Sequence, residues 1–115
     1  MQRIMLKSKI HRAVLTGADL HYEGSIAIDP ILLSAADILP NEQVQVLNIN
    51  NGSRITTYAI AAEWGSGTIM LNGPAARSGL VGDMVVILSY AHFETKEIVN
   101  YEPKIVKVDS QNRMI

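Results

Sequence analysis

The sequence predicts a mainly β fold, a compact β-barrel with short helices, that forms a single domain over residues 1–115. Although 48% of the 115 residues are hydrophobic, only one Phe and one Trp are present, so aliphatic side chains that suit strands must build the core. Short apolar segments recur between turns rich in Gly, Pro, Asn and Asp. They do not alternate regularly with helices, which argues against a parallel α/β sheet.

Two strands are predicted near the N-terminus. Residues 4–11 alternate apolar and polar side chains with a period of two, which is typical of a half-buried strand and places Lys9 and His11 on one basic face. Residues 16–19 have the composition of a turn, and residues 25–28 form the next apolar strand.

A short helix is predicted over residues 31–36. Asp29 is a good N-cap, and Pro30 is well suited to the first helical position. Pro40 marks the loop that follows the helix.

The clearest local signal is a hairpin with strands over residues 44–49 and 54–60. The intervening Asn51-Gly52 dipeptide favours a type I′ turn. Alternation along the second strand places Arg54, Thr56 and Tyr58 on one face.

The remaining elements are shorter. A strand over residues 68–72 lies within a glycine-rich stretch, and a helical turn is predicted over 74–77. The apolar run at 84–88 indicates a buried strand, and residues 102–109 are expected to add an edge strand.

Composition excludes several classes of protein. Ten basic and eleven acidic side chains give a net charge of -1, which does not favour binding to nucleic acid or to a membrane surface. The absence of cysteine suits a reducing compartment, so a cytoplasmic protein is expected. The longest apolar run falls far short of the ~20 residues that span a bilayer. The three histidines lack metal-ligand spacing, and no metal site is predicted.

The informative segment is Ala18–Asp29, with the sequence ADLHYEGSIAID. A Gly-Ser pair alone means little, because the pair recurs twice elsewhere in turn-like settings. With this segment and several further matches in register, the chain resembles the pyruvoyl-dependent aspartate 1-decarboxylases over roughly residues 4–108. The further matches are Lys9-Ile10-His11-Arg12, Asn51-Gly52 leading to Arg54, Thr57-Tyr58-Ala59-Ile60, Asn72-Gly73 with Ala75-Ala76, and Gly82-Asp83 with Tyr90-Ala91.

The resemblance implies a double-psi β-barrel that assembles as a homotetramer and cuts itself between Gly24 and Ser25, giving fragments 1–24 and 25–115. Ser25 would become a covalent pyruvoyl cofactor. The enzyme would convert L-aspartate to β-alanine and CO2, feeding pantothenate and coenzyme A biosynthesis. A helper protein for maturation is a further partner that the resemblance allows.

The residue types at the cut suit this chemistry. A serine hydroxyl can attack the preceding carbonyl, and the resulting ester eliminates more readily than an amide. Gly24 leaves that carbonyl sterically open and permits strained backbone angles. The product pyruvoyl group replaces pyridoxal phosphate as an electron sink, which explains how a chain without a cofactor motif could decarboxylate an amino acid.

The resemblance also assigns roles to side chains. Tyr58 matches a proton donor, and a tyrosine hydroxyl remains protonated at neutral pH. Arg54 and Lys9 are natural partners for the two substrate carboxylates. Thr57 matches a position used in self-processing and substrate contact, yet strict alternation places it opposite Arg54 and Tyr58. A site shared between subunits or a local bulge would reconcile the two.

The loop at residues 72–75 matches a substrate-contact segment that comprises Asn72, Gly73, Pro74 and Ala75, whose amides could bind a carboxylate or oxyanion. Pro74 replaces the usual alanine and has no N–H to donate. Trp64 stands where arginine is common and is interpreted as a surface or subunit contact.

Two alternatives stand beside the enzyme. One is a noncatalytic β-barrel interaction module that never matures. The other is a self-processing decarboxylase for a different amino acid, because specificity depends on few side chains.

Overall fold

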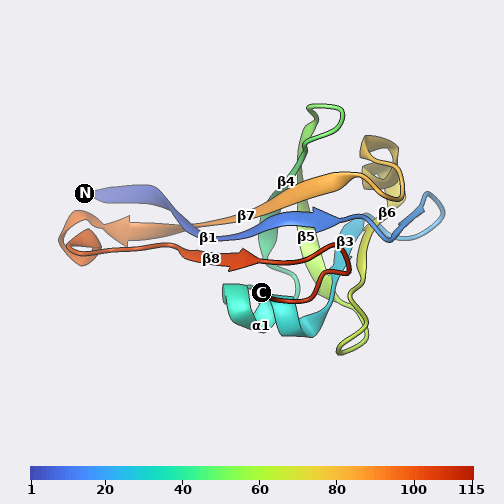
Figure 1. The fold of residues 1–115 in the computed structure, drawn as a ribbon. Helices are drawn as coiled ribbons and strands as arrows, with labels where there is room; N and C mark the ends of the chain where they lie inside the picture. Colours follow the sequence, from blue (N-terminus) through green and yellow to red (C-terminus); the bar gives the residue numbers. More distant parts are fainter.

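The computed structural model describes residues 1–115 as a single unit of eight strands with three short helices (Figure 1). The strands are β1 (Gln2–Val14), β2 (Gly17–Asp19), β3 (Ser25–Ile28), β4 (Gln43–Asn48), β5 (Arg54–Ala61), β6 (Ile69–Asn72), β7 (Met84–Glu94) and β8 (Lys104–Lys107). The helices are α1 (Pro30–Ala36) and the 3-10 helices η1 (Gly73–Ser78) and η2 (Thr95–Ile98).

The first two strands lie towards opposite edges of the strand order, although they follow each other in the chain. The strand order is β2-β6-β3-β5-β4-β7-β1-β8, so β2 lies at one end while β1 lies near the other. Only residues 15 and 16 separate β1 from β2, and both form backbone hydrogen bonds to neighbouring segments. One continuous segment therefore links the edge strand β2 to β1, the strand next to the opposite edge strand β8. This confirms the mainly β prediction and is consistent with a double-psi β-barrel.

Aliphatic side chains fill the interior, as the composition predicts. A cluster of 19 buried residues includes Ile10, Ile26, Ile28 and Ile87, none of which is exposed to solvent. The helix α1 adds Leu32, Leu33 and Ala36 to this core. The Asp29 side chain caps the helix by accepting a hydrogen bond from the N–H of Ile31 at 3.0 Å, which confirms the predicted N-cap.

Two predicted turns are wrong in detail. Residues 16–19 are not a turn, because residues 17–19 form β2 and pair in parallel with β6. This tertiary pairing overrides the local composition. The hairpin of β4 and β5 is confirmed, but only Gly52 of its predicted turn dipeptide has a positive φ, at 77°, so the turn is not type I′. The Asn48 side chain organises a longer loop instead, through bonds to the N–H groups of residues 50 and 51.

β1 and β7 are longer than predicted. Their paired outer ends, residues 2–6 with 90–94, project beyond the barrel as a ribbon and give the molecule extents of 43 × 28 × 24 Å (Figure 1). Ile4 lies in this ribbon and is 67% exposed, contrary to the predicted buried face. The predicted edge strand at the C-terminal end is confirmed as β8, parallel to β1. The structure contains no helix with the length and apolar character needed to span a membrane.

Candidate active site

Ser25 lies where an exposed loop meets a buried strand. Residues 20–23 are exposed, Gly24 is half-buried, and Ser25 at the start of β3 is only 1% exposed. Outside the strands and helices, no backbone–backbone hydrogen bond involves residues 20–24. The Gly24-Ser25 peptide therefore joins an exposed loop to a strand whose first residue is buried.

The side chain of Asn72 makes the shortest hydrogen bond to the Ser25 hydroxyl. The two residues face each other in the antiparallel pairing of β3 with β6, and Asn72 Nδ2 donates to Ser25 Oγ at 3.1 Å. Ser25 Oγ donates in turn to the carbonyl of Glu23 at 3.4 Å, a long bond. Asn72 is fully buried, and its Oδ1 has no hydrogen-bond partner. A buried acceptor without a partner lowers the stability of the folded chain. Asn72 Oδ1 is therefore an acceptor beside Ser25 that is available to a further donor.

Gly73 allows the next segment to approach the cut site closely. Its φ is +64°, and a Cβ built there would lie 2.8 Å from the N and Cα of Gly24 and from the carbonyl oxygen of Tyr22. A side chain at this position would collide with backbone as well as adopt a disfavoured conformation. Glycine is therefore required for residues 22–24 to pack against the start of η1.

A groove of about 410 Å³ opens beside this junction. One wall is the first part of β5, and the other is η1 with Gly24 at its end. The lining residues are Gly24, Ile55, Thr56, Thr57, Tyr58, Pro74, Ala75 and Ser78. Five residues predicted from the sequence to serve the site thus line one groove, namely Gly24, Thr57, Tyr58, Pro74 and Ala75. Ser25 follows Gly24 in the sequence, and Asn72 faces Ser25 across the pairing of β3 with β6.

The groove accounts for the conflict over Thr57. Thr57 pairs with the buried Val44 and so faces inward, opposite Tyr58, as alternation requires. The ladder between β4 and β5 has no register shift, so no bulge is involved. Registered pairing of β5 with β3 begins only at Ala59. Before that point the groove runs along the edge of β5, where successive residues from both faces can line it.

The two predicted carboxylate-binding residues do not line this groove. Arg54 is exposed on the outer face of β5, where its Nη1 donates to Gln45 Oε1 at 2.8 Å. Lys9 faces the same side, because it pairs with Leu88, which pairs with Gln45, which pairs with Thr56. Three strand spacings, about 14 Å, separate Lys9 from Thr56 within one chain.

The surroundings of Lys9 are strongly basic. Burial and the nearby charges of Lys9, Arg12 and Lys107 lower the pKa of His11. His11 is therefore neutral at pH 7, and its Nδ1 is buried without a partner. This end of β1 presents cations that no acidic residue neutralises through an ion pair.

The other end of β3 is closed by Asp29. Its carboxylate accepts hydrogen bonds from the N–H groups of Ile31, Gly65 and Gly67 at 2.8–3.0 Å. Burial alone would raise the pKa of Asp29, but these three donors and the charge of Arg113 outweigh it and lower the pKa. The carboxylate ties α1 to the loop between β5 and β6.

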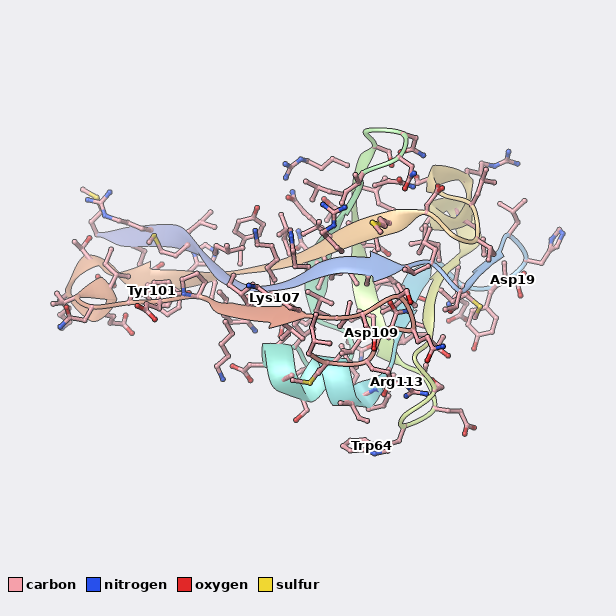
Figure 2. The ribbon with its side chains drawn as sticks, viewed as in Figure 1. Asp19, Trp64, Tyr101, Lys107, Asp109 and Arg113 are labelled. Carbon is pink, nitrogen blue, oxygen red and sulfur yellow. The ribbon has the colours of Figure 1, made fainter.

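Both departures from the expected sequence pattern are visible in the structure. Pro74 is the second residue of η1 and lies against Gly24, since a Cβ added to that glycine would be 3.6 Å from Pro74 Cδ. Trp64 projects away from the barrel at the tip of the loop between β5 and β6 and is 72% exposed (Figure 2). Pro74 thus touches the candidate site, while Trp64 lies on the surface.

The residues at the junction fit a group made from Ser25. The serine is buried at the head of a rigid strand, its hydroxyl already accepts a bond from Asn72, and the free Asn72 Oδ1 can receive a further donor. No group of three or more His, Asp or Glu side chains is positioned to hold a metal ion.

A single mainly β domain with a buried serine at the head of one strand, beside a groove lined in part by a tyrosine, has the architecture of a small β-barrel enzyme. The particular family follows from comparison with known sequences. The chain belongs to the aspartate decarboxylase family, whose sequence model matches residues 1–115.

Curated relatives match the chain over its whole length. An aspartate 1-decarboxylase of Thermoanaerobacter pseudethanolicus is 59% identical over 115 residues, which cover 100% of this chain and 98% of the relative. One of Syntrophobacter fumaroxidans is 57% identical, covering 98% of this chain and 91% of the relative. Aspartate 1-decarboxylase 2 of Gloeobacter violaceus is 52% identical, covering 100% and 92%.

Proposed function

We propose that this chain is a self-processing aspartate 1-decarboxylase, which converts L-aspartate to β-alanine and CO2 and feeds pantothenate and coenzyme A biosynthesis. The observation that carries the proposal is the junction of Ser25, Asn72 and Gly73 beside a groove that contains Tyr58, in a chain whose relatives are aspartate 1-decarboxylases. High identity over the full length favours the enzyme over a noncatalytic interaction module.

The first reaction is the cut between residues 24 and 25. Ser25 Oγ attacks the carbonyl carbon of Gly24, the peptide C–N bond breaks, and the hydroxyl proton passes to the new amine. Elimination then removes the Cα proton of residue 25 and breaks the bond between its Cβ and the ester oxygen, which forms the Cα=Cβ double bond of dehydroalanine and releases fragment 1–24 with a carboxylate at Gly24. Hydrolysis of the remaining dehydroalanine, with loss of ammonia, leaves a pyruvoyl group at the head of fragment 25–115.

Three features of the chain support this step. Asn72 Nδ2 bonds to Ser25 Oγ and restricts its rotation. Gly73 keeps the backbone of residue 24 close to η1. The loop at residues 20–23 is exposed and can depart after the cut, while the strand that begins at Ser25 stays in the sheet.

In the second reaction the groove binds aspartate. The pyruvoyl group supplies the electron sink for the bonding electrons left when CO2 departs. Tyr58 lines the groove and donates a proton to the carbon that has lost CO2. Thr57, Asn72, Gly73 and Ala75 hold the substrate against that position, and Pro74 contributes shape without a donor.

Recognition of the second carboxylate requires another subunit. Lys9 is too distant from the groove to reach it in its own chain, whereas its outward, basic face is free to meet a neighbouring copy. The proposed assembly is a homotetramer in which Arg54 of one chain and Lys9 of another bind aspartate. Light scattering should report a tetramer, and a fully active monomer would contradict this assembly. A helper protein for maturation is part of the same proposal.

The activity test uses the processed protein without added cofactor. We expect release of β-alanine and CO2 from L-aspartate, followed by chromatography of the amine product. Equal or faster turnover of L-glutamate would identify a decarboxylase for another amino acid. A processed protein inert towards both would contradict the proposed function. Since a chain without cysteine suits a reducing compartment, the proposal locates the reaction in the cytoplasm.

A further inference from the structure

We propose that Asn48 is a positioning residue that sets the width of the substrate groove and thereby the length of acid that the enzyme accepts. This rests on the proposed decarboxylase function and deepens it. Asn48 touches neither Ser25 nor the groove, so it acts through the two walls that it joins.

The segment before one wall of the groove is hydrogen-bonded to a single carbonyl group at the end of the other wall. One wall belongs to β5, which follows the hairpin loop at residues 49–53, and the other is η1, which ends at Ser78. The carbonyl oxygen of Ser78 accepts hydrogen bonds from Asn48 Nδ2 at 3.0 Å, Asn51 Nδ2 at 3.0 Å and Ser53 Oγ at 3.2 Å. The loop that leads into one wall is thus fastened to the end of the other.

The three side chains that bind the Ser78 carbonyl, those of Asn48, Asn51 and Ser53, are called the clamp below. Asn48 is its buried member, with only 3% of its surface exposed. Its Nδ2 also donates to Asp83 Oδ2 at 2.9 Å, and its Oδ1 accepts from the N–H groups of Asn50 and Asn51 at 2.8 and 3.3 Å. Every donor and acceptor of the side-chain amide is therefore occupied. One side chain fixes the hairpin loop, the end of η1 and the turn before β7 relative to one another.

The packing beside the clamp leaves little slack. A Cβ added at Gly79, the residue after η1, would lie 2.5 Å from Leu15 Cδ1 and 3.1 Å from Asn48 Nδ2. Because the residue that follows η1 packs closely against Leu15 on its inner side, we expect loss of the Asn48 amide to let the end of η1 move outward and widen the groove. A shift of about 1 Å in a positioning element can lower catalysis by as much as about 100-fold.

Asn112 provides a matched control. It is likewise buried, at 2% exposed, and its amide bonds to both backbone groups of Val14 and to the carbonyl of Gly67. These contacts tie the C-terminal segment to β1 and to the loop between β5 and β6, away from the groove. Asn48→Ala and Asn112→Ala therefore remove comparable buried hydrogen bonds, and only the first touches a groove wall.

The test compares selectivity, because a ratio of two substrates is independent of how much active enzyme each sample contains. Fully processed parent, Asn48→Ala and Asn112→Ala proteins are assayed for kcat/KM with L-aspartate and with L-glutamate, and for inhibition by succinate and glutarate. For Asn48→Ala we expect an aspartate kcat/KM reduced about 10- to 100-fold. The preference for the shorter acid should also fall, by about three- to tenfold. Asn112→Ala should keep the parent ratios.

Unchanged ratios in Asn48→Ala would overturn the proposal even if its activity were low. If that variant does not fold, the double variant of the exposed Asn51 and the half-buried Ser53, Asn51→Ala with Ser53→Ala, removes the other two donors to Ser78 and should shift the ratios in the same direction. Parent ratios in that double variant would equally overturn it. If the parent protein shows no decarboxylation, the proposed function is wrong. If the parent is active but the ratios of the variants are unchanged, only the proposed role of Asn48 is wrong.

Discussion

The two ends of the short strand β3 are built in opposite ways. At its C-terminal end, the Asp29 carboxylate is buried and accepts three backbone hydrogen bonds, so all of its main partners are in place. At its N-terminal end, Ser25 is equally buried, but its bond to Glu23 is long and the Oδ1 of its partner Asn72 is unpaired. Only residues 26–28 lie between the junction at Ser25, which has an unpaired acceptor, and the junction at Asp29, whose carboxylate is fully bonded.

The contrast distinguishes the proposed reactive end of β3 at Ser25 from a structural end at Asp29. A buried polar group without a partner costs roughly 1 to 3 kcal/mol, so the Ser25 end stores unfavourable interactions that the Asp29 end does not. Both ends belong to β3, which is held by its pairing with β5 and β6. Changes at the first end should therefore alter chemistry, and changes at the second should alter stability.

The largest effect is expected from Ser25→Ala, which removes the attacking hydroxyl and the precursor of the cofactor together. Cleavage and β-alanine formation should both be abolished, whereas the fold should persist because alanine fits the buried position. Denaturing gel electrophoresis and an assay of β-alanine measure the two losses. Cleavage that persisted between residues 24 and 25 would rule out the serine mechanism.

Tyr58→Phe should divide the two reactions. The ring and its packing remain while the acidic hydrogen is lost, so the chain should still cut itself. A positioned general acid contributes about 10²- to 10⁴-fold, and β-alanine formation should fall by that order. The assay requires a full pyruvoyl complement, established beforehand by mass spectrometry, since incomplete maturation would imitate the defect. Turnover at the parent rate would reduce Tyr58 to a packing residue.

Two glycines allow the ends to be compared directly. Gly73 at the Ser25 end and Gly67 at the Asp29 end have φ values of +64° and +68°, and a Cβ at either would lie within 2.8 Å of backbone atoms. Gly73→Ala and Gly67→Ala should each cost about 1 to 3 kcal/mol of stability. Only Gly73→Ala should displace the cut site and slow cleavage, by about 10- to 100-fold.

The cleavage rates of the two glycine variants are measured at a temperature at which both proteins remain folded by circular dichroism. Equal slowing in both would mean that general destabilisation, and not the local contact with residue 24, governs processing. In that case the distinction between the two ends would be lost.

The smallest effect is expected from Asp29→Asn. The new amide group would place N–H donors against backbone N–H groups, which should cost about 1 to 3 kcal/mol and leave the cleavage rate unchanged. Because the folded pKa of Asp29 is lowered, its ionised form stabilises the fold above the unfolded pKa of about 3.9, and this contribution is lost as pH falls through the folded pKa. The Tm difference between parent and variant should therefore shrink below about pH 4. A difference that stayed constant to lower pH would contradict this account.

Much of the fold could be predicted because, for many segments, the structure favoured by the local sequence is also the one that the packing of the folded chain requires. Asp29-Pro30 begins a helix in the prediction and in the structure. The aliphatic runs at residues 25–28 and 84–88 form strands that contribute to the core, as predicted. The failures occur where distant segments decide the structure. Residues 17–19 become a strand only because β6 lies beside them, and Ile4 is exposed because its ribbon extends past the barrel.

The site was predicted unevenly for the same reason. The resemblance identified the residues that gather around Ser25, but the pattern along β5 could not show that the groove follows the edge of the strand. Asn48 was not singled out, since nothing local distinguishes it from Asn50 or Asn51. Its proposed role rests on contacts between three segments that meet only in the folded chain.

The central claim is that the unsaturated junction at Ser25 turns the serine into a cofactor. Intact-mass spectrometry of the fully matured protein under denaturing conditions tests this without a substrate. We predict two species, residues 1–24 and residues 25–115, with the larger lighter by one ammonia than simple hydrolysis would leave it. A chain that stayed whole after prolonged incubation with any helper, or a larger fragment that retained an N-terminal serine, would contradict the account.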